Sequence, residues 1–576
     1  MISPVEPRSS LPRDAGPSKK KKRSWLRRNG SFAPLFALTL GLAGAVAACQ
    51  GCRDPLTPAG EVGVASDKPT LRLYASSTIA GAIEPCGCTK DQLGGIDHLA
   101  AFVESEKANA KTSWMVAAGP LFFLDPTLRE DDKQQTLWKA EAMAQAAKQL
   151  GLVAWTPGAN DWAGGRKTLG DLANLAGTPL LAANLSIAGD SEGATGTTPT
   201  LVREVDGIKI GFFGLAEPKD KLGRAPAGVT TRPPNEAAKE AIEKLKADGA
   251  RVLVGVLSIP RGDALRLADN FPEIAVLVLG KPVEVGDTND APKPPVLLGN
   301  TLVVETSNHL QTVGVIDLHI APGKKDGLVT FQDAGGVAKS EELLSVSTRI
   351  RDLEQKINGW EGDPNVKPED LAARKADLEK LRAEKLRLEK TETPVTGSFF
   401  RYKLVEVREK MGADPKVEAE LKAFYKRVNE HNKVAFADRK PKPPEARQAG
   451  YIGIDACTDC HDEERKVWDS TPHARAYETL QKDSKEYNLD CVSCHVTGYG
   501  KPGGSTVTHN EKLQDVQCEI CHGPGSLHAK KPDKKDLIVL KPSPDTCVSE
   551  CHHPPHVEGF DPVAKMKLIL GKGHGM

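Results

Sequence analysis

Cysteine and histidine residues recur at one short spacing in the last quarter of this chain of 576 residues. Three segments read C-x-x-C-H, and a fourth has one extra residue between its two cysteines. Two thiols and an imidazole at this spacing reach one porphyrin from a single turn, where the thiols form thioethers and the imidazole binds the iron. The segments therefore predict four haem c groups, attached through Cys457 and Cys460, Cys491 and Cys494, Cys518 and Cys521, and Cys547 and Cys551, with iron ligation by His461, His495, His522 and His552.

The four segments use eight of the twelve cysteines in the chain. A single pair of this kind also suits a zinc site or a disulfide bond, so both stay open as alternatives. Four repeats in so short a stretch of sequence favour haem over either of them.

Histidines are concentrated in the same region, which holds ten of the 14 in the chain. Such clustering indicates that several serve as second, distal ligands to the haem irons. The candidates are His473, His528, His553 and His556, ahead of His509 and His574. Ligation by two histidines closes the iron to substrate, which favours electron transfer over catalysis.

The rest of the chain must position these groups. Residues 69–335 alternate apolar runs of strand length with helical stretches, which predicts an α/β domain with helices on the faces of its sheets. Residues 340–445 have apolar positions spaced by three and four, which predicts a helical hairpin or short coiled coil followed by a linker. The haem domain is expected over 446–576, mostly irregular with short helices.

The first 48 residues have the order of an export signal, with a basic run before an apolar stretch. The stretch ends in V-A-A-C, which resembles a bacterial lipoprotein box with Cys49 as the lipid-bearing residue. An ordinary signal peptide cut near the same point is the alternative. Residues 49–68 are expected to be a tether. Both interpretations place the protein in the cell envelope, and the lipoprotein interpretation anchors it in a membrane, preferably the outer one.

The haem region resembles the tetrahaem cytochrome c-554 family of multihaem c-type cytochromes. The resemblance is carried by residues 468–476 (W-D-S-T-P-H-A-R-A), 491–499 (C-V-S-C-H-V-T-G-Y) and 516–528 (V-Q-C-E-I-C-H-G-P-G-S-L-H). It implies that His473 and His528 are distal ligands, each to a haem other than the nearest in sequence. The family also has members with one five-coordinate haem. The fourth segment departs from the family by its longer spacing.

The α/β region resembles the metallophosphoesterase domain of bacterial 5′-nucleotidases, a layered αββα fold. The likeness lies in residues 94–100, 158–161, 182–185 and 208–215. Such enzymes hold two metal ions with Asp, His and Asn side chains. Here the expected ligands are replaced: Thr78 ends the first strand region, Pro120 follows Gly119, and Lys281 stands where a histidine is expected. A catalytically degenerate domain is therefore expected, and an active phosphoesterase is the least favoured alternative.

Two further cysteines, Cys86 and Cys88, lie in the loop after the first predicted strand. Two thiols so close together suit a metal, a sulfur species or redox chemistry, or are inert. A direct disulfide between them would be strained.

These features favour a membrane-anchored multihaem cytochrome that carries electrons between redox partner proteins of the bacterial envelope. Its α/β domain would serve docking or binding. The alternative is a redox enzyme that acts on a small nitrogen or sulfur compound at an open haem or at Cys86 and Cys88. Lysine plus arginine equals aspartate plus glutamate, 77 each, so no general basic charge points to nucleic acid. Nothing in the sequence predicts the oligomeric state.

Overall fold

The computed structural model describes residues 68–86, 92–188, 197–286, 288–322, 327–361, 366–390, 395–553, 557, 560–571 and 573–574. All of them belong to one compact unit, Gly60–Met576. The lipidation candidate Cys49, the thiol candidate Cys88 and the histidine candidate His556 lie outside the described residues.

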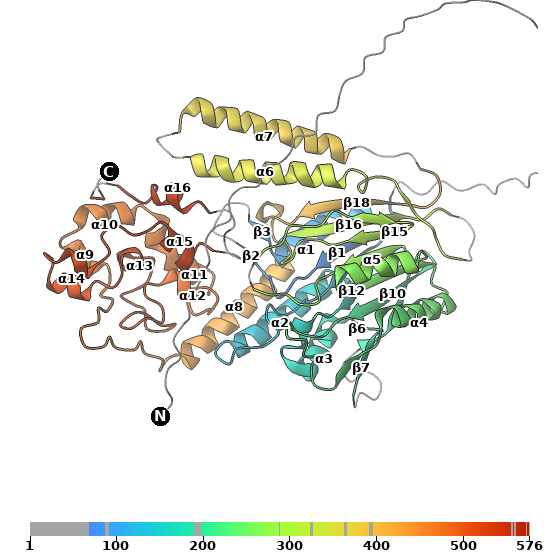
Figure 1. Cartoon of the computed structure of the whole chain (residues 1–576), viewed down its shortest axis with the longest axis horizontal. Helices are drawn as coiled ribbons and strands as arrows, with labels where there is room; N and C mark the ends of the chain where they lie inside the picture. Colours follow the sequence, from blue (N-terminus) through green and yellow to red (C-terminus); the bar gives the residue numbers. More distant parts are fainter. Residues whose placement is uncertain are drawn as a thin grey trace, which may run out of the picture. The chain divides into compact units, whose positions relative to one another are not determined.

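Two sheets form the centre of the α/β domain (Figure 1). The larger sheet has the strand order β17 (Gln332–Asp333), β18 (Phe399–Glu406), β16 (Thr312–His319), β1 (Leu71–Ser77), β4 (Ser113–Ala118), β5 (Leu152–Thr156), β6 (Leu180–Leu181) and β8 (Thr197–Thr198). The smaller sheet has the order β14 (Val296–Leu298), β15 (Thr301–Val304), β13 (Val276–Leu279), β12 (Val252–Ser258), β10 (Ile208–Ala216) and β9 (Thr200–Val205). Strands β1, β4 and β5 run parallel, as do β10, β12, β13 and β15.

The sheets pack face to face because successive side chains of a strand point to opposite sides. In β1, Leu71, Leu73 and Ala75 enter the core between the two sheets, whereas Tyr74 faces the helices outside. In β12, Val254 lies in the same inner core and Leu253 packs outward. Both faces of each sheet are therefore covered, which explains the continuous apolar runs of these strands.

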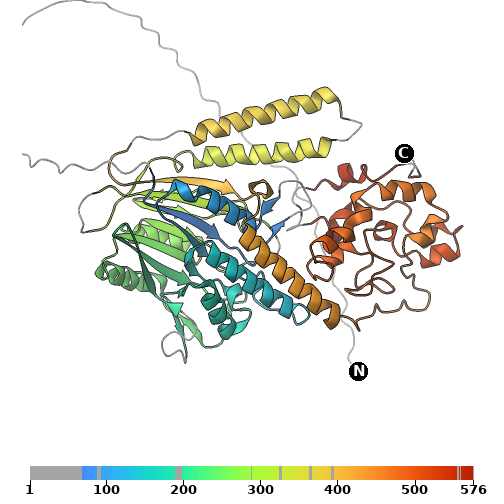
Figure 2. The same cartoon turned by 180° about the vertical axis from the view of Figure 1, so that it is seen from behind.

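Helices form the two outer layers. The larger sheet is covered by α1 (Ile96–Glu106), α2 (Lys133–Gln149), α3 (Gly165–Ala176) and α8 (Pro415–Ala435). The smaller sheet is covered by α4 (Pro234–Ala247) and α5 (Arg261–Asn270). Figure 2 shows α2 and α8 side by side on their layer, and their residues share one apolar cluster. The predicted layered α/β fold class is confirmed.

Residues beyond 335 complete this domain. Strand β18 pairs antiparallel with β16 along its whole length, from Phe399 to Glu406. Helix α8 contributes Val417, Leu421 and Phe424 to the core outside the larger sheet. The α/β layers therefore take in strand and helix from the 340–445 stretch, beyond the end at 335 expected from sequence.

The expected helical hairpin lies between β17 and β18. It consists of α6 (Ser340–Trp360) and α7 (Pro368–Glu389), which have an apolar cluster of their own. The buried members are Val346, Ile350, Ile357, Leu378, Leu381 and Leu388. Spacings of three, four and seven residues put each set on one face of its helix.

The haem region has short helices joined by irregular chain, as expected. They are α9 (Asp455–Thr458), α10 (Asp462–Asp469), α11 (Ala476–Lys482), α12 (Val492–His495), α13 (Cys518–His522), α14 (Ser526–Lys530), α15 (Asp545–Glu550) and α16 (Pro562–Met566). Its buried apolar cluster is small and consists of Phe436, Tyr477, Leu480, Val492, Val496 and Val507. In the part of the chain that the structure describes, no helix is both long enough and apolar enough to cross a membrane.

Candidate haem-binding site

Each cysteine pair lies on or beside one helical turn. Cys518, Cys521 and His522 all belong to α13, so their spacing of three and four residues puts them on one side of that turn. In the first segment, the backbone N–H of His461 donates to the Cys457 carbonyl at 3.0 Å, which closes the same kind of turn. Two thiols and one imidazole therefore point from a single turn, as attachment to one porphyrin requires.

The fourth segment absorbs its extra residue in a wider turn. The N–H of His552 donates to the Cys547 carbonyl at 2.8 Å, and that of Cys551 donates to the same carbonyl at 3.3 Å. One acceptor thus holds both groups, although the histidine lies five residues from the first cysteine instead of four. The longer spacing is compatible with the same attachment chemistry.

Backbone carbonyls orient two of the four proximal histidines. The Nδ1 atom of His495 lies 2.5 Å from the Ala476 carbonyl oxygen, and that of His522 lies 2.6 Å from the Val539 carbonyl oxygen. A carbonyl only accepts, so Nδ1 carries the proton in both rings and Nε2 keeps a free lone pair. A hydrogen bond from the other ring nitrogen is the usual way to fix a metal-binding imidazole. Burial lowers the pKa of both histidines, which favours the neutral form that binds a metal.

His473 faces the fourth segment. Its ring centre lies 6.3 Å from that of His552. Two imidazoles that share a metal, each with its nitrogen about 2 Å from the ion, have ring centres about 6 Å apart. Burial lowers the pKa of both rings, and each is disposed to be neutral. The structure thus brings together a proximal and a distal candidate that are 79 residues apart in the sequence.

Four other distal candidates lie in the described residues, and one of them, His509, has its Nδ1 atom 3.1 Å from the Thr508 hydroxyl oxygen. The Nδ1 atom of His528 is buried without a hydrogen-bond partner. Burying a polar atom in this way costs free energy unless a bound group satisfies the ring. Burial lowers the pKa of His552 most, and His473 and then His553 lower it further, so His553 also lies close to His552. His574 ranks lower from the sequence. Burial is the main cause of the lowered pKa of His522, and His574 is a smaller one, so the two histidines lie close together. The fold therefore brings the end of the chain close to the third segment.

Thiols of different segments meet in pairs. Cys457 shares a hydrogen bond with Cys518, which raises its pKa. The Cys551 thiol donates to the Cys494 carbonyl at 3.8 Å, and the Cys494 thiol donates to the Glu550 carbonyl at 3.9 Å. The first segment therefore lies beside the third, and the second beside the fourth. The residues present therefore fit the attachment of haem, and their segments lie in two neighbouring pairs.

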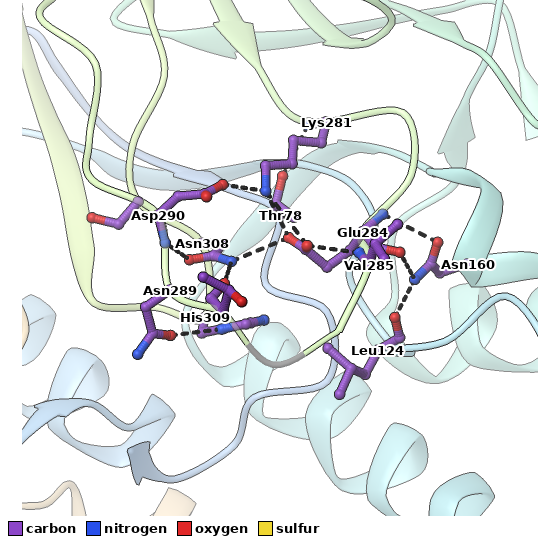
Figure 3. A network of polar contacts seen from close by, with 12 residues as sticks. Thr78, Leu124, Asn160, Lys281, Glu284, Val285, Asn289, Asp290, Asn308 and His309 are labelled. Carbon is purple, nitrogen blue, oxygen red and sulfur yellow. Dashed lines mark hydrogen bonds and ion pairs between the residues drawn. The ribbon is translucent and has the colours of Figure 1, made fainter. Parts of the chain in front are cut away.

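A separate polar cluster lies where the parallel strands of both sheets end (Figure 3). Lys281 forms ion pairs with Glu284, at 3.2 Å, and with Asp290. Its backbone N–H donates to Thr78 Oγ1 at 2.9 Å. The Asn160 amide donates to the Glu284 carbonyl at 3.2 Å and accepts from the Glu284 N–H at 3.3 Å. The polar groups of this cluster thus bind one another.

Asp161 is similarly occupied. Its buried carboxylate accepts hydrogen bonds from the backbone N–H groups of Leu121, Phe122 and Gly158, at 2.8–3.0 Å. Burial raises the pKa of Asp161 to about 6, although the three hydrogen bonds act to lower it. Among the described residues, no group of three or more His, Cys, Asp or Glu side chains is placed to hold a metal ion.

Cys86 ends strand β2 (Pro85–Cys86), which pairs with β3 (Leu93–Gly94). The side chain of Cys86 lies outside the described part of the structure, as does the whole of Cys88. The thiol chemistry expected of this pair stays a prediction.

Comparison with known proteins supports the cytochrome resemblance. Residues 456–523 match the family model described as cytochrome c554 and c-prime, which takes in the first three attachment segments. The chain is 36% identical over 96 residues to cytochrome c-554 of Nitrosomonas europaea, a match that covers 14% of this chain and 41% of that protein. The chain thus spans less than half the length of this curated relative. The predicted resemblance of the C-terminal region is confirmed.

Solved structures are similar at lower identity. The 5′-nucleotidase precursor from Thermus thermophilus has a TM-score of 0.41 at 16% identity, covering 71% of this chain and 68% of that one. The sulfate thiohydrolase SoxB of Thermus thermophilus has a TM-score of 0.42 at 14% identity, covering 64% and 62%. The calcineurin-like phosphoesterase YfkN from Bacillus subtilis has a TM-score of 0.36 at 19% identity, covering 44% and 86%.

Proposed function

We propose that this protein is a lipid-anchored, tetrahaem c-type cytochrome that carries electrons between redox partner proteins of the bacterial cell envelope. The observation that carries the proposal is the convergence of four Cys–Cys–His turns on one small domain, with His473 opposite His552 at a separation suited to a shared iron. Haem, when bound, supplies an iron centre that accepts and releases one electron.

The protein's own residues would hold and orient the haem groups. The eight cysteines of the four segments would hold the haem groups through thioether bonds. The carbonyls of Ala476 and Val539 hold His495 and His522 in the tautomer that leaves Nε2 for the metal. His473, whose ring centre lies 6.3 Å from that of His552, would be the second ligand of the iron at the fourth site and would close that position to an external ligand. Closed positions and fixed neighbours suit electron transfer better than chemistry on a bound substrate.

The α/β domain is proposed as a catalytically degenerate, phosphoesterase-like domain that serves docking or binding. Support comes from the polar cluster at the strand ends, where Lys281 stands at a position expected to hold a histidine and forms ion pairs with Glu284 and Asp290. Asp161 is likewise committed to three backbone N–H groups. Groups already satisfied by one another have little free energy to gain from a metal.

Location in the envelope follows from the cofactor, because haem c is attached outside the cytoplasm. Residues 1–48 would direct export, and Cys49 would carry the lipid. A position in the outer membrane, facing the periplasm, is the preferred form of this proposal.

Two measurements on the purified full-length protein test the haem assignment. The mass after acid–acetone extraction should exceed that of the mature chain by four haem masses. A redox-titrated absorbance spectrum should show c-type bands, with little change on addition of cyanide or carbon monoxide. Haem that extracts into acetone would refute covalent attachment, and three retained haems would refute a role for Cys547 and Cys551. Large spectral changes with added ligand would favour a redox enzyme with an open haem.

The degenerate α/β domain has its own test. The protein should release no phosphate from nucleotides in the presence of Mn²⁺ or Zn²⁺, and it should retain neither metal after dialysis. Metal-dependent turnover that persists through purification would overturn the proposal.

A further inference from the structure

Seven residues that lead into the second attachment segment are held by the α/β domain. This stretch, residues 485–491, is called the docking segment below. The Gln135 amide on α2 donates to Asn488 Oδ1 at 3.1 Å and accepts from the Leu489 N–H at 3.1 Å. On α8, the Asn432 amide donates to the Tyr487 carbonyl at 2.9 Å and to Gln135 Oε1 at 3.1 Å. Two helices of one domain thus hold the entry to a haem site in the other.

These contacts are buried. Gln135, Asn432 and Asn488 are each 2% exposed. Loss of these contacts within the folded protein would leave buried amide groups without hydrogen-bond partners, which is unfavourable. The contact is therefore a fixed part of the fold, and the two domains work as one body at this point.

Two ion pairs join the same surfaces. Lys139 Nζ on α2 lies 2.9 Å from Asp490 Oδ2, and Lys485 Nζ lies 2.6 Å from Glu84 Oε1. Lys485 also lies over the Tyr425 ring, 4.4 Å from its centre. In each pair, the α/β domain contributes one charge and the docking segment contributes the other.

These four charges act on the second attachment site. Burial raises the pKa of the Cys491 thiol to about 12; Asp490 and Glu84 raise it further, whereas Lys485 and Lys139 lower it. The charges that reach this sulfur also reach a haem bonded to it. Each pair thus brings one charge of each sign to the site, and the two signs act in opposite directions.

We propose that Glu84 and Lys139 of the α/β domain set the reduction potential of the haem bound at Cys491 and Cys494. They act as positioning and charge-balancing residues, each compensating one charge of the docking segment. This inference rests on the proposed function, since it requires haem at that site. It gives the α/β domain a definite task, which is to tune one of the four redox centres.

The two residues have opposite expected effects. Reduction adds a negative charge to the haem, so a nearby uncompensated cation stabilises the reduced form and an uncompensated anion destabilises it. Glu84→Gln removes the nearer counter-charge of Lys485, leaves Asp483 at 3.8 Å as a weaker partner, and should raise one midpoint potential. Lys139→Gln removes the cation that lies 2.9 Å from Asp490 and should lower the same potential. Each change should be severalfold in the equilibrium constant for reduction.

Matched controls carry the same charge changes on α2, outside the docking contact. Glu141→Gln removes the partner of Arg427, and Lys133→Gln removes the partner of Glu130. Both pairs are solvent-exposed, so water screens their loss. Neither control should move any midpoint potential by as much as the test variants.

The experiment is a spectroelectrochemical titration of the full-length holoprotein and its four variants, with haem count measured by mass. Opposite shifts of one potential, with the other three nearly fixed, would support the inference. Unmoved potentials, shifts of equal sign, or equal shifts in the controls would overturn it. A protein without haem at Cys491 and Cys494 would instead refute the proposed function, and mass analysis separates that outcome from the others.

Discussion

At the scale of single residues, the two domains differ in whether their buried polar groups have partners within the chain. In the α/β domain, Asp161, Lys281 and Glu284 are paired with other groups of the chain. In the haem domain, His528 buries a ring nitrogen that has no protein partner, and His473 and His552 face each other across a gap. Because an unpaired buried polar atom is costly, the first arrangement is complete by itself and the second requires a cofactor.

A pH effect is predicted for Asp161. Its pKa is raised to about 6 by burial, whereas an exposed aspartate titrates near 3.8. A group with a raised pKa in the folded state contributes stability below its unfolded pKa and loses it as the pH rises through the folded value. The free energy of unfolding should therefore fall between about pH 4 and pH 7, by about 3 kcal/mol from this group.

The measurement is denaturant unfolding followed by far-ultraviolet circular dichroism across that pH range. Asp161→Asn cannot titrate and should lack this part of the pH dependence, whatever its overall stability. The same pH dependence in variant and wild type would show that the pKa of Asp161 is not raised.

A ligand effect is predicted for His473. His473→Ala should open one iron position, so one additional haem per protein should bind cyanide or carbon monoxide. Absorbance and electron paramagnetic resonance would show the change from a low-spin to a high-spin centre. His431→Ala, which removes a histidine of α8, is the control and should leave the spectra unchanged. A variant that keeps every haem low-spin would contradict the pairing of His473 with His552.

At the scale of elements, local patterns were predictable and long-range ones were not. The apolar run of β1 and the helical spacing in α6 and α7 are visible in the sequence because each reflects one element's own faces. The pairing of β18 with β16 depends on contacts between segments some 80 residues apart, and no local pattern specifies it.

The residues of the candidate site likewise fall into those predictable from local spacing and those that depend on the tertiary fold. Attachment cysteines and proximal histidines follow from spacing within a turn. The approach of His473 to His552, the position of His574 and the amide network of Gln135 depend on how distant segments fold together. Asparagine and glutamine are also common surface residues, so nothing marked Gln135 or Asn488 in advance as interface residues.

The short helices of the haem domain are predicted to depend on haem. Among its described residues, five belong to a buried apolar cluster with Phe436, and Ile454, Leu513 and Val557 are buried elsewhere, whereas ordering the chain costs about 1–2 kcal/mol of backbone entropy per residue. Burial at about 25 cal/mol per Å² from so few side chains does not offset that cost. Replacing all eight attachment cysteines with alanine should leave residues 452–576 disordered while the α/β domain still folds.

Limited proteolysis and circular dichroism of the variant decide the matter. Rapid cleavage confined to the C-terminal region, with the α/β domain protected, is the expected result. A protease-resistant C-terminal region of native size in the absence of haem would show that the protein core suffices.

At the scale of the whole molecule, the chain combines a large self-sufficient α/β domain with a small domain that is completed by its cofactors. The docking segment joins them through the Gln135 network and two ion pairs. These contacts fix the orientation of the second attachment segment relative to the α/β domain.

The last prediction concerns the proposed lipid anchor. If Cys49 carries lipid, its acyl chains contribute about 0.8 kcal/mol per buried CH₂ group, enough with more than one chain to hold the protein on a membrane. Cys49→Ser should move the protein from the membrane fraction to the soluble fraction. Cys52→Ser, three residues further on, should leave it with the membrane. Covalent haem in each variant would verify export, because attachment takes place outside the cytoplasm. Membrane retention of Cys49→Ser would point to another anchor, and a soluble wild type would favour an ordinary signal peptide.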